Sequence, residues 1–310
     1  MNKKINLYTL TGFLGSGKTT ILKSILTDFQ NQKIGVIQNE FGKLNIDGEI
    51  LRNDKIKMIE ISKGSIFCSC LKLSFVEALV EMSKQDIDTL FVESSGLADP
   101  SNMEEILAAV KVLAGDVYDF KGVICLIDGL NFESQIEDIE TVERQLKHCN
   151  IAMISKIDLI NSEKIEEITR KIRTFNPVCL IETSALGKFN INFLKEDLML
   201  YKWAETEETT NSVDNKPKTL FINCHKSIEM AKFQQFLDEI KKSCYRLKGF
   251  FLIDDKWFQV DVVGDKVDYL PCDAKEYSQI VIISKIGSDI IKPIFDIWFE
   301  IFGEKPELKN

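Results

Sequence analysis

Residues 12–20 constrain the fold of this chain more than any other segment. Three glycines, a lysine and two threonines follow an apolar run, in the order Gly-x4-Gly-Lys-Thr. Glycines let successive backbone N–H groups turn toward one centre, and a helix that begins there adds partial positive charge. The pattern predicts a phosphate-binding loop between a strand and a helix, formed by Gly12, Gly15, Ser16, Gly17, Lys18, Thr19 and Thr20.

This loop implies a nucleoside triphosphate and Mg²⁺. Lys18 is expected to bridge the outer phosphates, and the Thr19 hydroxyl to bind Mg²⁺. Glu93 ends a second apolar run, where an acid holds Mg²⁺ directly or through water, and Gly96 follows with an N–H for the terminal phosphate. An acid after a strand is also an ordinary helix cap, so the magnesium role depends on the phosphate loop.

A further polar segment, Ser155-Lys156-Ile157-Asp158, follows another apolar strand and resembles the Asn-Lys-x-Asp guanine box. Asp158 would accept hydrogen bonds from guanine N1 and N2, a donor pair that adenine lacks. Lys156 would lie along the base, while Ser155 replaces the usual asparagine. Ser184 and Ala185 follow the next strand and resemble the loop whose backbone contacts guanine. The predicted nucleotide is therefore GTP.

Short apolar strands alternate with helical patterns over residues 1–203. This alternation predicts an α/β fold, a P-loop NTPase domain with a mainly parallel sheet. The expected strands are Ile5–Leu10, Lys33–Gln38, Leu90–Glu93, Gly122–Asp128, Ile151–Ser155 and Val178–Glu182, and helices include Thr19–Phe29, Phe132–Lys147 and Glu163–Thr174.

Residues 204–217 are acidic and nearly free of apolar side chains, so they predict a linker. Residues 218–310 predict a small α+β domain with a turn at residues 263–266. Its expected strands are Thr219–Asn223, Tyr245–Ile253, Trp257–Val262, Val267–Leu270 and Gln279–Ser284, with helices Ile228–Lys242 and Asp289–Phe302.

The net charge of −9 argues against a nucleic-acid-binding protein, which usually needs a basic face. No apolar run approaches the length of a membrane span, and the first residues lack the apolar core of a signal peptide. We therefore expect a cytoplasmic protein without a membrane partner. Eight irregularly spaced cysteines are expected to be mostly reduced, with Cys125, Cys179 and Cys244 in the core.

Taken together, the motifs resemble those of the CobW family of P-loop GTPases, over nearly the whole chain and in the family's order. The resemblance rests on the phosphate loop and on Asn39-Glu-Phe-Gly42 with Ile46-Asp47, Glu93-Ser-Ser-Gly-Leu-Ala-Asp-Pro100 and Arg246-Leu-Lys-Gly-Phe250. It implies that the segment Asn39-Glu-Phe-Gly42 with Ile46-Asp47 is a switch. In this switch Glu40 supplies a carboxylate near Mg²⁺ or helps to place the attacking water. A surface glutamate is the alternative for Glu40.

Family members typically carry Gly-Cys-x-Cys-Cys as a thiolate-rich metal site, and this chain departs from that pattern. Ser65 and Phe67 replace two of the cysteines, Cys68 keeps its place and Cys70 is extra. Zinc prefers four ligands, so Cys68 and Cys70 would need completion by Glu40, His225 or a second subunit in a homodimer. A reduced or redox-sensitive cysteine pair is the alternative to a site for zinc or another transition metal.

The resemblance implies a GTPase that couples its GTP and GDP states to metal or cofactor delivery, with a client metalloprotein or cofactor-dependent protein as partner. Two other classes stay open at this point. An ATP-dependent small-molecule kinase on the same scaffold would prefer ATP and give Asp158 no role. A GTP-binding regulatory module would bind GTP without significant turnover.

Overall fold

The structure is a computed structural model that describes residues 3–28, 33–39, 56–61, 72–138, 140–207 and 217–309. The chain divides into two compact units, Met1–Asp214 and Asn215–Asn310. Among the described residues, no helix combines the length and the apolar character that crossing a membrane requires.

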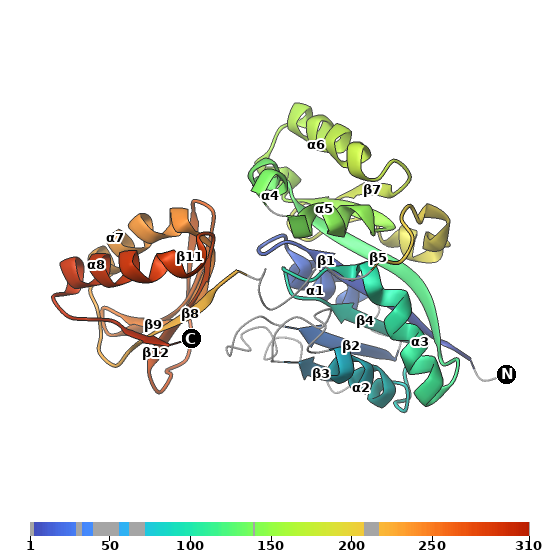
Figure 1. Ribbon diagram of the computed structural model, residues 1–310, viewed down its shortest axis with the longest axis horizontal. Coiled ribbons are helices and arrows are strands. Elements are labelled where there is room, and N and C mark those ends of the chain that lie inside the picture. The colour runs from blue at the N-terminus through green and yellow to red at the C-terminus, as the bar shows by residue number, and fades with distance from the viewer. Residues whose placement is uncertain are drawn as a thin grey trace. The chain divides into compact units, whose positions relative to one another are not determined.

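The first unit is built on one parallel sheet, as the alternation of strands and helices predicts (Figure 1). In the described residues it has seven strands in the order β3-β2-β4-β1-β5-β6-β7. The strands are β1 (Ile5–Gly12), β2 (Ile34–Asn39), β3 (Ile56–Ile61), β4 (Thr89–Glu93), β5 (Tyr118–Asp128), β6 (Ile151–Ser155) and β7 (Leu180–Thr183).

Helices cover both faces of this sheet because its strands are apolar on both sides. Phe91 faces a core cluster that includes Ile21 and Leu22 of the first helix, and the next residue, Val92, faces a cluster that includes Phe75 and Ile106. The helices of the unit are α1 (Lys18–Asp28), α2 (Lys72–Met82), α3 (Met103–Ala114), α4 (Phe132–Asp138), α5 (Glu140–Lys147) and α6 (Ser162–Phe175). Residues 132–138 and 140–147, which the sequence predicts to lie in one helix, are helical in the described part of the chain.

The strand order decides where the polar strand ends meet. β4 pairs with both β1 and β2, so Glu93 lies opposite Leu10 on one side and opposite Gln38 on the other. β5 pairs with β1 and β6, which places Asp128 opposite Ser155. Because the strands are parallel, all of these carboxyl ends lie along one edge of the sheet, the usual ligand-binding edge of an open α/β sheet.

The part of the second unit that the structure describes is an antiparallel sheet with two α-helices, α7 (Met230–Ile240) and α8 (Ile291–Phe302), as predicted for a small α+β domain. Its core contains Phe233, Phe236, Phe251 and Trp298. In the described residues its strands follow the order β11-β10-β9-β12-β8-β13. They are β8 (Thr219–Cys224), β9 (Cys244–Ile253), β10 (Lys256–Val263), β11 (Lys266–Pro271), β12 (Ser278–Ser284) and β13 (Glu307–Lys309).

Two of the strands, β3 and β13, are additional to those that the sequence predicts. β3 mixes apolar residues with Lys57 and Glu60, and it is the outermost strand of its sheet in the described residues. β13 has only three residues, two of them charged, and pairs with β8. Neither segment has the apolar run that identifies a buried strand, so its own residues do not predict it. The strand conformation of each depends on pairing with a neighbouring strand.

The segment that resembles the C-terminal marker of the family lies in β9, a central strand. Arg246 donates two hydrogen bonds to Asp261 of β10, at 2.9 and 2.8 Å. At Gly249 a Cβ atom would lie 2.0 Å from the carbonyl oxygen of Gln279 in β12, so a larger residue would push the two strands apart. Strand pairing within the second unit therefore explains why this segment contains an arginine at 246 and a glycine at 249.

Candidate functional site

The phosphate loop connects β1 to α1 and has the backbone that its glycines permit. Gly12 has φ = +131°, and a Cβ atom there would lie 2.2 Å from the carbonyl oxygen of Leu126 in β5. Gly15 and Gly17 also have positive φ, at 75° and 93°. These values lie in the region that residues with a side chain rarely adopt, which explains why the loop requires glycine.

The Lys18 side chain folds back onto the backbone of the phosphate loop. The Lys18 ammonium donates hydrogen bonds to the carbonyl oxygens of Gly12, at 2.8 Å, and Phe13, at 3.0 Å, and Lys18 is buried. The hydroxyl of Ser16 and that of Ser184 are also buried, and neither has a hydrogen-bond partner among the described residues. Buried hydroxyls without partners suit a ligand rich in acceptors, such as a phosphorylated nucleotide.

A hydroxyl and a carboxylate, the two groups predicted to bind Mg²⁺, meet at the end of this loop. Thr19 Oγ1 donates to Glu93 Oε1 at 2.6 Å, and Gln38 Nε2 donates to Glu93 Oε2 at 2.9 Å. Glu93 is 4% exposed, at the end of β4. A threonine hydroxyl next to a buried carboxylate fits the preference of Mg²⁺ for oxygen ligands at phosphate sites.

Gly96 lies against the phosphate loop, as its predicted role requires. A Cβ atom at Gly96 would lie 2.7 Å from the backbone nitrogen of Leu14. The segment is also held from the other side, where Gln145 Nε2 of α5 donates to the carbonyl oxygens of Gly96, at 3.3 Å, and Ala98, at 2.8 Å. Sequence analysis missed Gln145, because a single polar residue in an amphipathic helix does not indicate a functional role.

The predicted guanine box reaches the same edge of the sheet. Ser155 Oγ lies 2.7 Å from the carbonyl oxygen of Ser16 and 2.9 Å from that of Ile127, so its hydroxyl ties the end of β6 to the phosphate loop. Lys156 adopts a left-handed backbone conformation, with φ = 60°, and its ammonium pairs with Asp128 at 2.8 Å.

Asp158 and the segment that contains Ser184 and Ala185 lie together. Asp158 Oδ1 accepts a hydrogen bond from the backbone N–H of Leu186 at 3.1 Å, and Asp158 is exposed. The segment also lies against α1, since a Cβ atom at Gly187 would be 2.8 Å from Thr20 Cγ2. The structure thus gathers Thr20, Asp158 and the segment after β7 beside the phosphate loop.

Asp128 is a second residue that sequence analysis missed. It is fully buried at the end of β5, where it accepts hydrogen bonds from Lys156 Nζ at 2.8 Å, Asn131 Nδ2 at 2.9 Å and the backbone N–H of Leu130 at 3.1 Å. A carboxylate this buried requires such donors. Its signal was present, because an acid that ends an apolar strand is the pattern that identified Glu93.

Behind Gly96, an arginine connects the segment after β4 to residues 198–207, which we call the strap. Arg144 of α5 donates to Asp99 Oδ2 at 2.7 Å and to Ser101 Oγ at 3.0 Å. Its other guanidinium nitrogen, Nη1, donates to Glu207 Oε2 at 3.2 Å. Asp99 is fully buried, and its Oδ1 atom also accepts a hydrogen bond from the backbone N–H of Ser101 at 3.0 Å.

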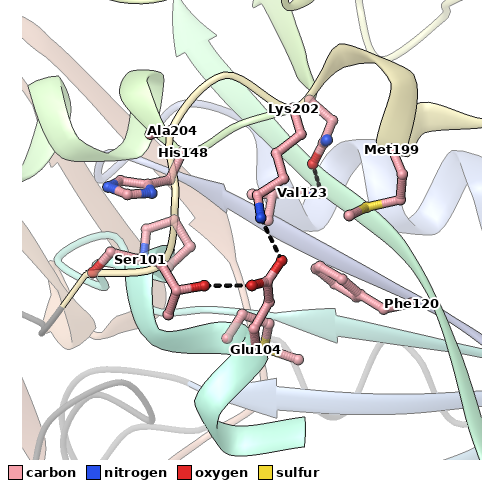
Figure 2. A pocket seen from close by; sticks show the side chains of 12 residues that line it. Ser101, Glu104, Phe120, Val123, His148, Met199, Lys202 and Ala204 are labelled. Carbon is pink, nitrogen blue, oxygen red and sulfur yellow. Dashed lines mark hydrogen bonds and ion pairs between the residues drawn. The ribbon is translucent and has the colours of Figure 1, made fainter.

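The strap is also fastened to the start of α3. Lys202 donates to Glu104 at 2.8 Å, and the two side chains meet across a small cavity (Figure 2). This hydrogen bond lowers the pKa of Glu104, and a hydrogen bond from Lys147 lowers the pKa of Glu207. Burial lowers the pKa of His148, which lines the same cavity, so its imidazole favours the neutral form.

The predicted transition-metal site lies outside the part of the chain that the structure describes. Cys68, Cys70 and Glu40 all fall in residues 40–55 or 62–71, so these predictions stay untested. His225 lies in the second unit, where its side chain is exposed and its Nε2 atom lies 3.3 Å from Glu307 Oε2. Among the described residues, no three His, Cys, Asp or Glu side chains are grouped so that they could hold a metal ion.

The parallel sheet, the phosphate loop and the Thr19–Glu93 pair define a P-loop nucleotide-binding protein. The nucleotide-binding domain model named CobW/HypB/UreG matches residues 6–181, and the model of the cobalamin synthesis protein cobW C-terminal domain matches residues 218–293. The chain belongs to the CobW/HypB/UreG family.

Its curated relatives include the zinc chaperone YjiA of Escherichia coli, which is 30% identical over 69% of this chain and 66% of the relative. The zinc-regulated GTPase metalloprotein activator 1 of Schizosaccharomyces pombe is 25% identical over 86% of this chain and 77% of its own length. A crystal structure of Zn(II)-bound YjiA GTPase from E. coli has a TM-score of 0.48 at 21% identity, covering 97% of this chain and 99% of that one.

Proposed function

We propose that this protein is a Mg²⁺-dependent GTP hydrolase. The observation that carries the proposal is the meeting, at one edge of the sheet, of the phosphate loop, the Thr19–Glu93 pair and the segment with Lys156 and Asp158. The first two suit a magnesium nucleotide, and the third suits a guanine base. A curated relative with GTPase in its printed name supports the same reaction.

In this proposal the chain stabilises charge on the terminal phosphates. The Lys18 ammonium and the backbone N–H groups of Gly15, Ser16 and Gly17 would bind phosphate oxygens, while Thr19 and Glu93 would hold Mg²⁺, which supplies positive charge as the bond breaks. Glu40 is the predicted carboxylate near Mg²⁺, and it could also place the attacking water. Such stabilisation is fixed before the reaction begins, so little reorganisation is needed in the transition state.

Base selection is assigned to the segments at the ends of β6 and β7. Asp158 would accept from guanine N1 and N2, and the Leu186 N–H that it already binds supports the orientation of its carboxylate. Lys156 would lie along the base, positioned by its ion pair with Asp128. Ser184 and Ala185 would contact the base through their backbone.

We also propose that the nucleotide state is passed to the C-terminal part of the chain for delivery of metal or a cofactor to a client protein. The names zinc chaperone and metalloprotein activator among the relatives support a metalloprotein client, with zinc as cargo. Arg144 offers the route, since it contacts Asp99 and Ser101, near Gly96, and also Glu207 in the strap. The predicted linker, residues 204–217, begins within the strap, and residues 218–310 would act as the client-facing domain.

The direct test compares phosphate release from GTP and ATP by the purified full chain, with Mg²⁺ and with EDTA. We expect slow GTP hydrolysis that requires Mg²⁺, and at least about 100-fold weaker turnover of ATP. A preference for ATP would favour the small-molecule kinase. Tight GTP binding without phosphate release would favour a regulatory module.

The proposed route to the strap predicts the behaviour of Glu207→Gln. This change removes the charge that pairs with Arg144 and Lys147 but leaves Arg144 on the buried Asp99. Loss of a partly exposed ion pair costs about 1 kcal/mol, so amide hydrogen exchange in residues 198–207 should quicken about fivefold. The difference in exchange there between GDP and a slowly hydrolysed GTP analogue should shrink.

Glu205→Gln is the matched control, because it removes the same charge from an exposed residue of the strap that pairs only with Lys202 among the described residues. It should leave the nucleotide-dependent difference intact. If the Glu207→Gln protein keeps the full difference, the ion pairs of Arg144 and Lys147 do not carry the signal.

A further inference from the structure

Gln38 is a buried polar residue with no assigned task so far. It lies at the carboxyl end of β2, 3% exposed, and immediately precedes Asn39 and Glu40 in the chain. In the parallel pairing of β2 with β4 it lies directly opposite Glu93. Its Nε2 atom donates a hydrogen bond of 2.9 Å to Glu93 Oε2.

This hydrogen bond restricts the orientation of the Glu93 carboxylate. The two oxygens are differentiated, because Oε2 accepts from Gln38 while Oε1 accepts from Thr19 at 2.6 Å. A carboxylate on a strand can rotate about its last bond, and a donor fixed on the neighbouring strand opposes that rotation. Gln38 therefore holds Oε1 on the side of Thr19.

The amide is also suited to this position by its chemistry. A glutamine is neutral, so it donates to the buried carboxylate without competing with a bound cation for its charge. A lysine there would neutralise Glu93 and weaken its attraction for Mg²⁺, and an aliphatic side chain would leave Oε2 without this donor.

We propose that Gln38 is a positioning residue for the magnesium site: it orients Glu93 toward Thr19 and thereby sets the Mg²⁺ affinity of the nucleotide complex. The inference rests on the proposed function, because it assumes that Thr19 and Glu93 hold Mg²⁺. Residues that orient metal ligands in this way typically contribute 10- to 100-fold to metal affinity.

The test measures how Mg²⁺ slows the dissociation of fluorescently labelled GDP from the full-length protein. Gln38→Met keeps the length of the side chain and removes the donor. We expect the half-saturating Mg²⁺ concentration to rise about 10-fold, while GDP affinity in EDTA stays within about twofold of wild type. Gln38→Asn stays polar but withdraws the amide by one methylene, and it should raise the half-saturating concentration in the same direction if Gln38→Met does not fold.

Two comparisons separate positioning from packing. Ile37→Val changes the buried residue that precedes Gln38 in β2 and packs into the core on the other face of the sheet. This change should leave the Mg²⁺ dependence of GDP dissociation unchanged. In the Glu93→Gln background, Gln38→Met should have little further effect, because a positioning residue acts only through the group that it orients.

The outcomes distinguish this inference from the proposed function. A wild-type protein that retains GDP equally with and without Mg²⁺ would overturn the magnesium site and this inference with it. A magnesium-dependent wild type combined with an unchanged Gln38→Met protein would overturn the inference alone. Full additivity of Gln38→Met with Glu93→Gln would also overturn it.

Discussion

Lys18→Ala is expected to reduce GTP hydrolysis by about 100- to 1000-fold, the cost of removing one group that stabilises transition-state charge. The Lys18 ammonium lies within the curve of the phosphate loop, 2.8 Å from the carbonyl oxygen of Gly12 and 3.0 Å from that of Phe13. No other lysine or arginine occurs between residues 5 and 22. The alanine variant would leave the terminal phosphates without the charge of this side chain.

Phosphate release under single-turnover conditions, together with equilibrium binding of GTP, gives the measurement. The binding assay shows whether lost hydrolysis reflects lost affinity, which should fall at least about 10-fold. Lys23→Ala is the matched control, because Lys23 belongs to the same helix, α1, but lies five residues, more than one turn, beyond Lys18. A Lys18→Ala protein that binds and hydrolyses GTP as well as wild type would refute the proposed phosphate site.

Asp158→Asn is expected to change which base the protein prefers. The carboxylate of Asp158 can accept from both donors of guanine, whereas an asparagine presents one acceptor and one donor. The ratio of GTP to ATP affinity should therefore fall about 100-fold. Xanthosine triphosphate has a carbonyl in place of the guanine amino group, so its affinity for the variant should rise above that of GTP.

The asparagine is well suited to this test because its carbonyl can still accept the Leu186 N–H that Asp158 Oδ1 binds at 3.1 Å. Competition of the three nucleotides for one fluorescent analogue gives the measurement. Glu163→Gln, at the start of α6, removes a nearby exposed negative charge and should preserve the preference for GTP. If Asp158→Asn also preserves it, guanine recognition lies elsewhere, and the kinase alternative regains support.

The sequence predicts best those features that a short stretch of consecutive residues determines. The phosphate loop is contiguous, and its glycines fix a backbone that other residues rarely adopt, so residues 12–20 identify it without knowledge of the fold. Apolar strands that alternate with helices likewise report a parallel sheet. The sequence did not predict the strands β3 and β13, because pairing with a neighbouring strand, rather than their own apolar residues, defines them.

The functional contacts that sequence analysis missed join residues far apart in the chain. Gln38 and Glu93 are separated by 55 positions, Arg144 and Asp99 by 45, and no local pattern marks either pair. Asp128 and Lys156, 28 positions apart, are the intermediate case, since Asp128 ends one apolar strand and Lys156 directly follows another, but only the sheet makes those strands neighbours.

The sequence by itself thus determined the class of site, because a phosphate loop is a local backbone property carried by consecutive residues. Only the tertiary structure decided which side chains orient the predicted ligands. β4 pairs with both β1 and β2, and that pairing sets Gln38, Glu93 and Thr19 within hydrogen-bonding distance. The order of strands in a sheet arises from packing of the whole unit, which no single segment encodes.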